Sequence, residues 1–172
     1  MTVDDVREHF LKHVLKQGKP HLRTLTTTLV SFFVEWDHRL KMVDLRKAGS
    51  REAFFTHLFR GCLLFESLLK ENPRKRPSQA TLGQILRGNR FIRNQLGVPR
   101  SIHTGSRGLE TIVQSLKPKQ SMTEAIQCTA QTRNTLGHNL VWLTTSLDAK
   151  RYDLLANNIA ASCLHAISRL YR

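Results

Sequence analysis

The sequence predicts an all-α fold, and three observations support that prediction. Apolar residues recur at steps of three and four along nearly all of the 172 residues, which is the spacing of one face of an α-helix. No stretch alternates apolar with polar residues as a half-buried strand would. Glycine, proline and small polar residues separate the periodic segments, as they do where helices end and begin. With 40% hydrophobic residues, a chain of this length can bury the core of one domain, with or without an added subdomain.

Residues 1–48 are expected to form two amphipathic helices. The first spans residues 3–16 and ends before Gly18 and Pro20. The second spans residues 21–46. One continuous apolar stripe runs along this second helix: Leu22, Leu25, Leu29, Phe32, Phe33, Trp36, Leu40 and Val43. Such a segment could complete a helical bundle, exchange with a second copy of the chain, or dock another protein.

Residues 51–71 predict the most apolar helix of the chain. Gly49 and Ser50 supply a stop and an N-cap before it, and Pro73 ends it. One face of the helix is apolar throughout: Phe54, Leu58, Cys62, Phe65 and Leu69. Further leucines cover much of the remaining surface: Leu63, Leu64 and Leu68. A helix that is apolar nearly all round lies at the centre of its domain or is buried in a dimer.

The second half of the chain predicts further helices and one long loop. We expect a helix over residues 79–96, a Gly/Pro/Ser-rich loop over residues 97–107 and a short helix over residues 108–116. Ser121 and Glu124 form a capping box, which predicts a helix from there to about Trp142. Asp148 begins the last helix. Its apolar stripe is regular: Tyr152, Leu155, Ile159, Cys163, Ala166 and Leu170.

The charge of the chain favours an anionic partner. Its 27 Lys and Arg against 13 Asp and Glu give a formal charge of +14. Residues 72–109 contain no Asp or Glu, which suits a segment that follows an RNA backbone. The candidate RNA-binding residues are therefore taken from this segment: Arg74, Lys75, Arg76, Arg87, Arg90 and Arg93. The alternative is a solvated basic face that keeps the protein soluble.

Several classes of protein are not indicated by the sequence. Three widely spaced cysteines on apolar helical patterns read as buried thiols, not as a disulfide or zinc framework. No apolar run approaches the roughly 20 residues of a membrane span, and Asp4 and Asp5, where a basic n-region would lie, lead us to expect no signal peptide. We expect a cytoplasmic protein with no cofactor and no metal. His9 and His13 have metal-ligand spacing, but no third ligand accompanies them.

One charged residue interrupts an apolar stripe. Arg133 falls at the centre of the stripe that Ile126, Ala130, Gly137 and Leu140 form on the helix expected over residues 121–142. A charge buried there is costly unless it is paired, and such local conflicts often mark functional sites.

Glu66 is the candidate partner of Arg133, because it is polar within the most apolar helix. The alternative is an ion pair between Glu66 and Lys70, four residues further along.

Arg133 and His138 lie about 140° apart around an ideal helix, so regular geometry does not bring their side-chain ends together. Three arrangements could do so. The long arginine could reach round the helix, Gly137 could relax the helix, or a second copy of the chain could complete the pair.

Residues Arg133 to His138 (RNTLGH) resemble the R-x4-6-H signature of HEPN-domain ribonucleases, in the form with Asn after the Arg. The resemblance covers about residues 50–172. It implies a small all-α bundle whose first long helix packs against the signature helix. On this basis the chain divides into an N-terminal helical extension, residues 1–48, and a HEPN-like helical bundle, residues 49–172.

The resemblance implies a metal-independent endoribonuclease that cuts single-stranded RNA. HEPN ribonucleases are typically homodimers with a composite active site, and the ribose 2′-OH attacks the adjacent phosphate. His138 would then move the proton, and Arg133 would bind the phosphate and stabilise the developing charge. Asn134 would orient His138 or a phosphate oxygen, and Glu66 would hold Arg133 in the resting state.

Related proteins act in antiviral defence, as toxins beside an antitoxin, or as CRISPR-associated effectors. A separate regulator, antitoxin or sensor protein is therefore an expected partner. The alternative function is a non-catalytic all-α scaffold that binds RNA or protein through its basic face. A third possibility is a helical adaptor for an acidic protein, which would not prefer RNA over another polyanion.

Overall fold

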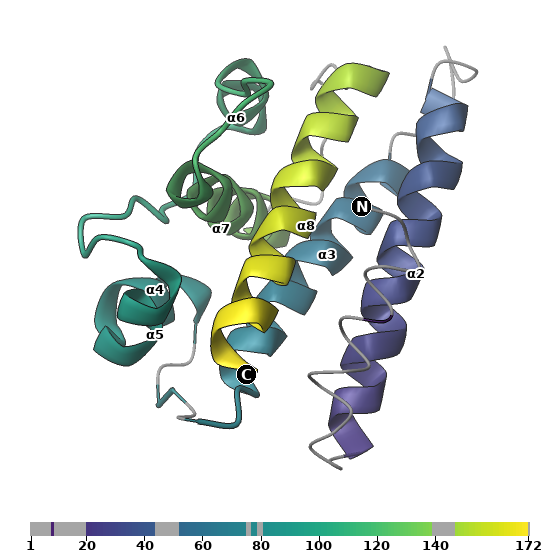
Figure 1. Ribbon diagram of the computed structural model, residues 1–172. Coiled ribbons are helices and arrows are strands. Elements are labelled where there is room, and N and C mark those ends of the chain that lie inside the picture. The colour runs from purple at the N-terminus through teal and green to yellow at the C-terminus, as the bar shows by residue number, and fades with distance from the viewer. Residues whose placement is uncertain are drawn as a thin grey trace.

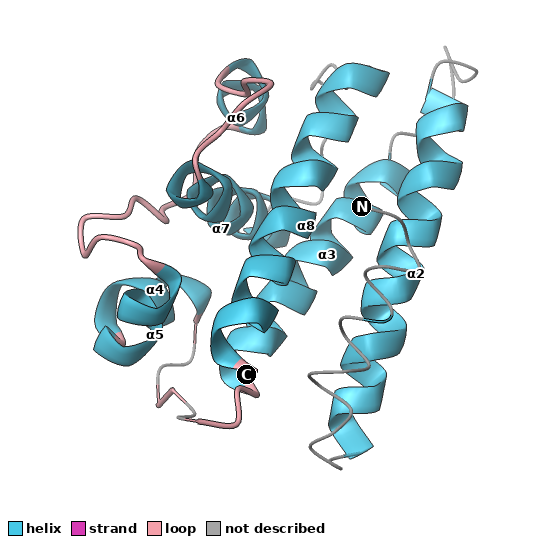
Figure 2. Ribbon diagram, viewed as in Figure 1, coloured by secondary structure: helices cyan, strands magenta, loops and turns pink. Residues whose placement is uncertain are grey.

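The computed structural model describes residue 8 and residues 20–43, 52–74, 77–78, 81–138 and 147–171. These residues form helices and loops without a strand, which confirms the all-α class for this part of the chain (Figure 2). The helix bounds are α2 Pro20–Val43, α3 Glu52–Lys70, α4 Leu82–Gly88, α5 Arg90–Leu96, α6 Leu109–Gln114, α7 Met122–His138 and α8 Ala149–Leu170. Of the helix expected over residues 3–16, only Glu8 is described, and it is helical. The expected ends of two other helices, residues 44–46 and 139–142, lie outside the described residues.

Helix α3 lies at the centre of the bundle. It packs against α2, α7 and α8, and α8 crosses in front of it (Figure 1). All five residues of its predicted apolar face are buried: Phe54, Leu58, Cys62, Phe65 and Leu69. Leu64 and Leu68 are buried as well, whereas Leu63 is 37% exposed. The apolar character of α3 on nearly every side is thus explained by its position within one chain.

Helix α2 completes this core. Leu22, Leu29 and Phe32 are buried in the same apolar cluster as the inward faces of α3 and α8. Gly61 allows the close approach of these helices, because a Cβ on Gly61 would collide with the Phe32 ring and would lie 2.8 Å from Ile159 Cγ2. Of the three roles considered for the N-terminal segment, the described part takes the first, completion of the bundle.

A buried histidine links α2, α3 and α8. His57 is 1% exposed, and its Nε2 lies 2.9 Å from the Phe32 carbonyl oxygen. A carbonyl can only accept, so Nε2 carries the proton, and Nδ1 accepts from the Tyr152 hydroxyl at 2.8 Å. The ring stacks on Phe32 with centroids 4.4 Å apart. Burial lowers the pKa of His57 below its ordinary value, in keeping with a neutral imidazole.

The single helix expected over residues 79–96 is wrong, because the chain breaks it at Asn89. Asn89 takes φ −84° and ψ 101°, outside the helical region, and ends α4 while capping α5. Its Oδ1 accepts from the Ile92 backbone N–H at 3.0 Å. Thr81 and Gln84 form a capping box at the start of α4. The apolar spacing continues across the break, which is why the pattern alone predicted one helix.

Other local predictions are confirmed. Ser121 and Glu124 form the expected capping box: each residue's backbone N–H donates to the other's side chain. Asp148 caps α8, and the whole apolar stripe of that helix is buried. The three cysteines are buried free thiols, and burial raises their pKa values, that of Cys128 to about 11.

Candidate functional site

The candidate site lies in the last two turns of α7, where α3 packs against it. Arg133, Asn134 and His138 are all on α7, and Glu66 on α3 binds Arg133. The packing of the first helix after residue 49 against the helix that carries Arg133 and His138 is therefore present in the structure.

Glu66 binds both of the partners considered for it. It is 4% exposed, and its Oε2 accepts from Arg133 Nε at 2.7 Å. Its Oε1 accepts from Lys70 Nζ at 2.6 Å. Ionised groups on both sides make these hydrogen bonds stronger than neutral ones. A buried carboxylate is thus compensated by two cations, and the charge of Arg133 on the apolar stripe is paired as expected.

The side chain of Arg133 extends toward the C-terminal end of α7. Its Nη1 lies 3.6 Å from the position that a Cβ on Gly137 would occupy, and a carbon of the Phe59 ring lies 3.4 Å from that position. The guanidinium has therefore reached the residue immediately before His138. Helix α7 stays α-helical through Gly137 and His138, so the helix is not relaxed at Gly137. Because Gly137 lies four residues from Arg133 on the same face of α7, this contact does not by itself bring the guanidinium to the imidazole of His138, and completion of the pair stays a prediction.

His138 is exposed at the C-terminal end of α7, and it has no hydrogen bond to another described residue. Asn134 was expected to orient His138 or a phosphate oxygen. In the structure its Nδ2 instead donates to the Thr104 carbonyl oxygen at 2.6 Å, and its Oδ1 lies 3.5 Å from Arg133 Nη1. The amide of Asn134 therefore holds a loop and one side of the guanidinium.

Three side chains on one face of α7 hold the backbone of residues 103–107, which we call the strap. Gln131 Nε2 donates to the His103 carbonyl oxygen at 3.2 Å, and Asn134 binds Thr104 as described above. The Thr135 hydroxyl donates to the Arg107 carbonyl oxygen at 2.7 Å and accepts from the Arg107 N–H at 3.3 Å. The sequence pointed to none of these contacts, because each joins a side chain to backbone about 30 residues away.

Thr104 connects the strap to α4. It is 1% exposed, and its Oγ1 would lie 2.9 Å from a Cβ on Gly83, so the loop and α4 are closely packed there. Through this contact the basic segment meets α7 next to Asn134. The strap thus gives the α4–α5 region a fixed position against the helix that carries Arg133 and His138.

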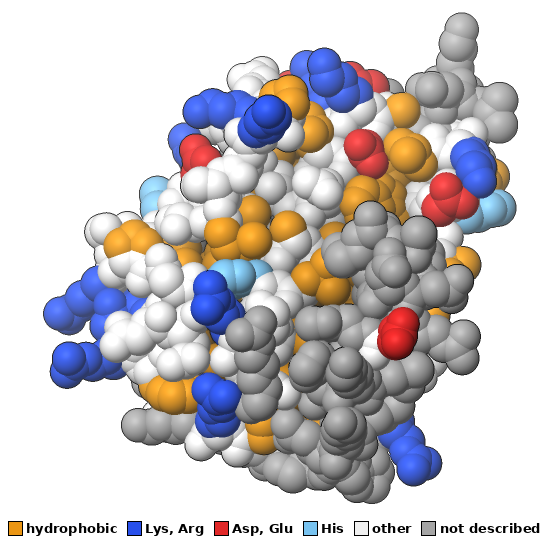
Figure 3. All heavy atoms as spheres, in the orientation of Figure 1, with side chains coloured by type: hydrophobic (Ala, Val, Ile, Leu, Met, Phe, Trp, Pro, Cys, Tyr) orange, Lys and Arg blue, Asp and Glu red, His pale blue; other side chains and the backbone are white. Residues whose placement is uncertain are grey.

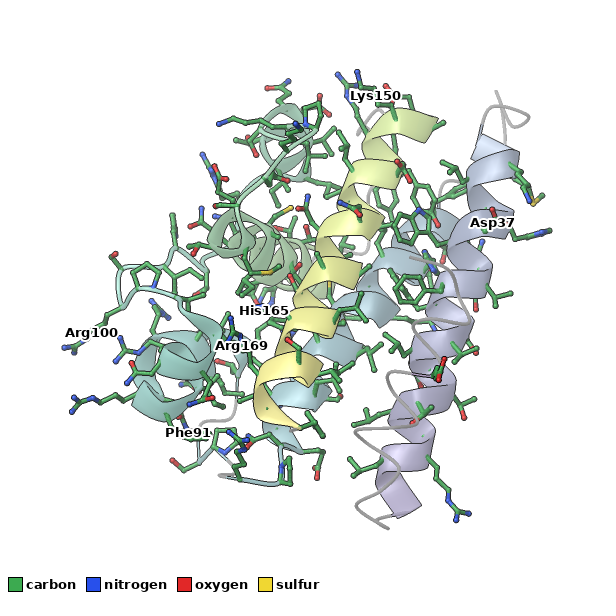
Figure 4. All side chains as sticks on the ribbon, viewed as in Figure 1. Asp37, Phe91, Arg100, Lys150, His165 and Arg169 are labelled. Carbon is green, nitrogen blue, oxygen red and sulfur yellow. The ribbon has the colours of Figure 1, made fainter. Side chains whose placement is uncertain are left out.

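The predicted RNA-binding residues gather along the α4–α5 edge of the molecule. Arg87 and Arg90 are exposed on α4 and α5, and Arg93 is half-buried. Figure 3 shows Lys and Arg side chains at this edge, and Figure 4 shows Arg100 pointing outward from the loop after α5. Arg74 is exposed beyond the end of α3, while the other two predicted residues, Lys75 and Arg76, lie outside the described residues.

The described residues contain neither a metal-ligand cluster nor a helix that could span a membrane. Over the ranges that the structure describes, no three His, Cys, Asp or Glu side chains are grouped as ligands for a metal ion. His9 and His13 lie outside those ranges. None of the described helices has both the length and the apolar character needed to cross a membrane.

Comparison with known proteins found no counterpart: no family model, no curated protein and no solved structure matches the chain. Membership of the HEPN family is therefore not shown.

Proposed function

We propose that the chain is a metal-independent endoribonuclease of the HEPN type, which cuts single-stranded RNA with Arg133 and His138. One observation carries the proposal. The Arg133 guanidinium, bound through Nε to buried Glu66, lies against Gly137, the residue that precedes exposed His138. On this proposal, a phosphate-binding cation and a proton-transfer group lie five residues apart in the last two turns of one helix.

The chemistry assigned to the pair is transesterification followed by release of the product. His138 accepts the proton of a ribose 2′-hydroxyl, since imidazole exchanges protons near neutral pH. The 2′-oxygen bonds to the adjacent phosphorus while the bond from phosphorus to the 5′-oxygen breaks. The 5′-oxygen takes up a proton, and the products carry a 2′,3′-cyclic phosphate and a 5′-hydroxyl.

Glu66 gives Arg133 a fixed orientation for this role. Nε is bound to the carboxylate, and Nη1 has a long contact of 3.5 Å with Asn134 Oδ1. On this proposal, Nη2 and the second N–H of Nη1 bind the phosphate oxygens. A donor that is already oriented needs little reorganisation when negative charge develops in the transition state. On this account Glu66 is a positioning residue and does not touch the substrate.

A homodimer would supply the second proton-transfer group. Phe59 is only partly buried and Leu63 is exposed, one turn apart on α3, and the Phe59 ring lies beside Gly137. A second copy packed over these side chains would bring His138 of the partner subunit near the leaving 5′-oxygen. Sedimentation at micromolar concentration tests this part, since a monomer would remove the composite site.

A non-catalytic RNA-binding scaffold is the second candidate, and the strap favours it. The hydrogen bonds from Gln131, Asn134 and Thr135 fix a basic loop on the bundle without any need for catalysis. Both candidates predict RNA binding that weakens with salt. They differ in the effect of removing the imidazole of His138.

The test is cleavage of labelled single-stranded RNA in EDTA by the wild type and by His138→Ala. His38→Ala is the matched control, because His38 is also exposed on a helix and has no hydrogen bond to a described residue. We expect cleavage by the wild type and His38→Ala, and a loss of at least about 100-fold in His138→Ala. Equal cleavage by all three proteins would exclude His138. Binding without cleavage by the wild type, over a panel of RNAs, would favour the scaffold.

A further inference from the structure

A pocket of about 320 Å³ opens between the end of α6 and the first half of α7. It is separate from the Arg133–Glu66 pair, and neither of those residues lines it. Its volume is in the range of pockets that hold small ligands. Six of the lining residues indicate which ligand would fit: Arg107, Leu116, Lys117, Gln127, Cys128 and Gln131.

Two cations, Arg107 and Lys117, and one carboxylate, Glu124, line the pocket, which leaves an excess of one positive charge. Arg107 is exposed and makes no ion pair with another described residue, while its backbone is fixed to Thr135. Lys117 has only a long contact of 3.9 Å with Glu124, and that carboxylate also accepts from the N–H and hydroxyl of Ser121. A fork of donors on a fixed backbone suits the oxygens of a phosphate group.

The same pocket offers amides beside an apolar surface. Gln127 has no hydrogen bond to a described residue, and Gln131 uses one of its N–H groups on the strap. A glutamine amide both donates and accepts, which is what the edge of a nucleobase requires. Half-buried Leu116 and the neutral thiol of buried Cys128 are the apolar part of a lining that is otherwise mainly polar.

The pocket and His138 share one face of α7. Gln127, Gln131, Asn134 and His138 follow one another at steps of three and four, so they form a single stripe along the helix. At a rise of about 1.5 Å per residue, the distance along the axis is about 10 Å from Gln131 to His138 and about 16 Å from Gln127. The strap crosses this stripe between the pocket and His138.

We propose that this pocket binds one nucleoside monophosphate unit, with Arg107 on the phosphate and Gln127 and Gln131 on the base edge. The unit has two possible sources. In an RNA strand it is a nucleotide beyond the one that is cut, and this form rests on the proposed function. A free mononucleotide would make the same contacts, and its effect on His138 would pass through the strap.

The test measures equilibrium binding of the four nucleoside monophosphates and of short single-stranded RNA to the full chain. Arg107→Gln and Gln127→Leu are compared with Arg100→Gln, an exposed arginine of the same loop that does not line the pocket. Thermal unfolding checks that each variant is folded. We expect about tenfold weaker binding in the two pocket variants and less than about threefold in Arg100→Gln, taking the loss of one charged or bidentate contact as the scale.

Measuring mononucleotide binding and RNA binding separately shows which of the two ligands the pocket holds. Loss of RNA affinity without mononucleotide binding assigns the pocket to the strand, and loss of mononucleotide affinity alone assigns it to a free nucleotide. Unchanged affinity for both ligands in both pocket variants would overturn the proposal. His138→Ala should bind a free mononucleotide as the wild type does, because His138 does not line the pocket. The binding assay tests the pocket, and the cleavage assay tests the ribonuclease. The failure of one proposal can therefore be told from the failure of the other.

Discussion

The ion pair between Glu66 and Arg133 should couple α3 to α7, and a double-mutant cycle measures that coupling. A hydrogen bond between charged groups contributes about 1.5–3 kcal/mol, and breaking a fully buried pair costs about 3–5 kcal/mol. Here the carboxylate is 5% exposed, but the Arg133 side chain is 22% exposed and Lys70 still faces the carboxylate. Partial solvation and the remaining lysine reduce the coupling, which we expect at about 1–2 kcal/mol.

The variants are Glu66→Gln, Arg133→Gln and the double substitution, unfolded in urea at neutral pH. Glutamine keeps the size and the hydrogen-bonding oxygen of Glu66 while it removes the charge. A second cycle with Lys70→Gln is the matched control. Lys70 is 38% exposed and lies four residues along the same helix, so its coupling should be below about 0.5 kcal/mol. A coupling between Glu66 and Arg133 below about 0.3 kcal/mol would refute the reasoning, since independent sites add within that error.

Three further substitutions test the packing of the helices and the pH dependence of stability. Gly61→Ala should lower the free energy of unfolding in urea by about 1–2 kcal/mol, because the clash at the helix crossing exceeds the gain in helix propensity. Gly137→Ala should raise it by about 0.5–1 kcal/mol, since the new methyl meets its neighbours at ordinary contact distances; equal effects at the two glycines would contradict this. Because the pKa of His57 is lowered, the unfolded chain takes up a proton first as pH falls below about 6.5. The free energy of unfolding should therefore fall below that pH by up to about 1.4 kcal/mol per pH unit. His57→Gln should lack this contribution to the pH dependence, measured by urea unfolding between pH 7 and pH 5.

The sequence predicted the elements whose signals are local. The apolar stripe and the N-cap of α8 and the capping box of α7 could be predicted from neighbouring residues alone, and all three were confirmed. The conflict at Arg133 was also visible, because a charge in an apolar stripe needs a partner whichever helix supplies it. Periodicity of three and four therefore predicted the all-α class and the position of Arg133, and Glu66 was predicted as its partner because it is polar within the most apolar helix.

One local break in a helix and the contacts between side chains and distant backbone were not predicted. The break at Asn89 was missed because apolar spacing continues through it, although Gly88 and Asn89 together were a usable stop signal. The strap depends on side chains of α7 meeting backbone about 30 residues earlier. The pocket at Arg107 depends on the same meeting of segments, so it follows from the tertiary structure alone.

The most direct test of the proposed activity is the chemistry of the cut that the wild type makes in EDTA. The cleavage position is first mapped on a single-stranded RNA, and the nucleotide on its 5′ side is then replaced by its 2′-deoxy form. If the 2′-hydroxyl attacks with the help of Arg133 and His138, the products carry 2′,3′-cyclic phosphate and 5′-hydroxyl ends. The same bond should not be cut in the deoxy substrate. Products with 3′-hydroxyl and 5′-phosphate ends, or unchanged cleavage of the deoxy substrate, would contradict this mechanism.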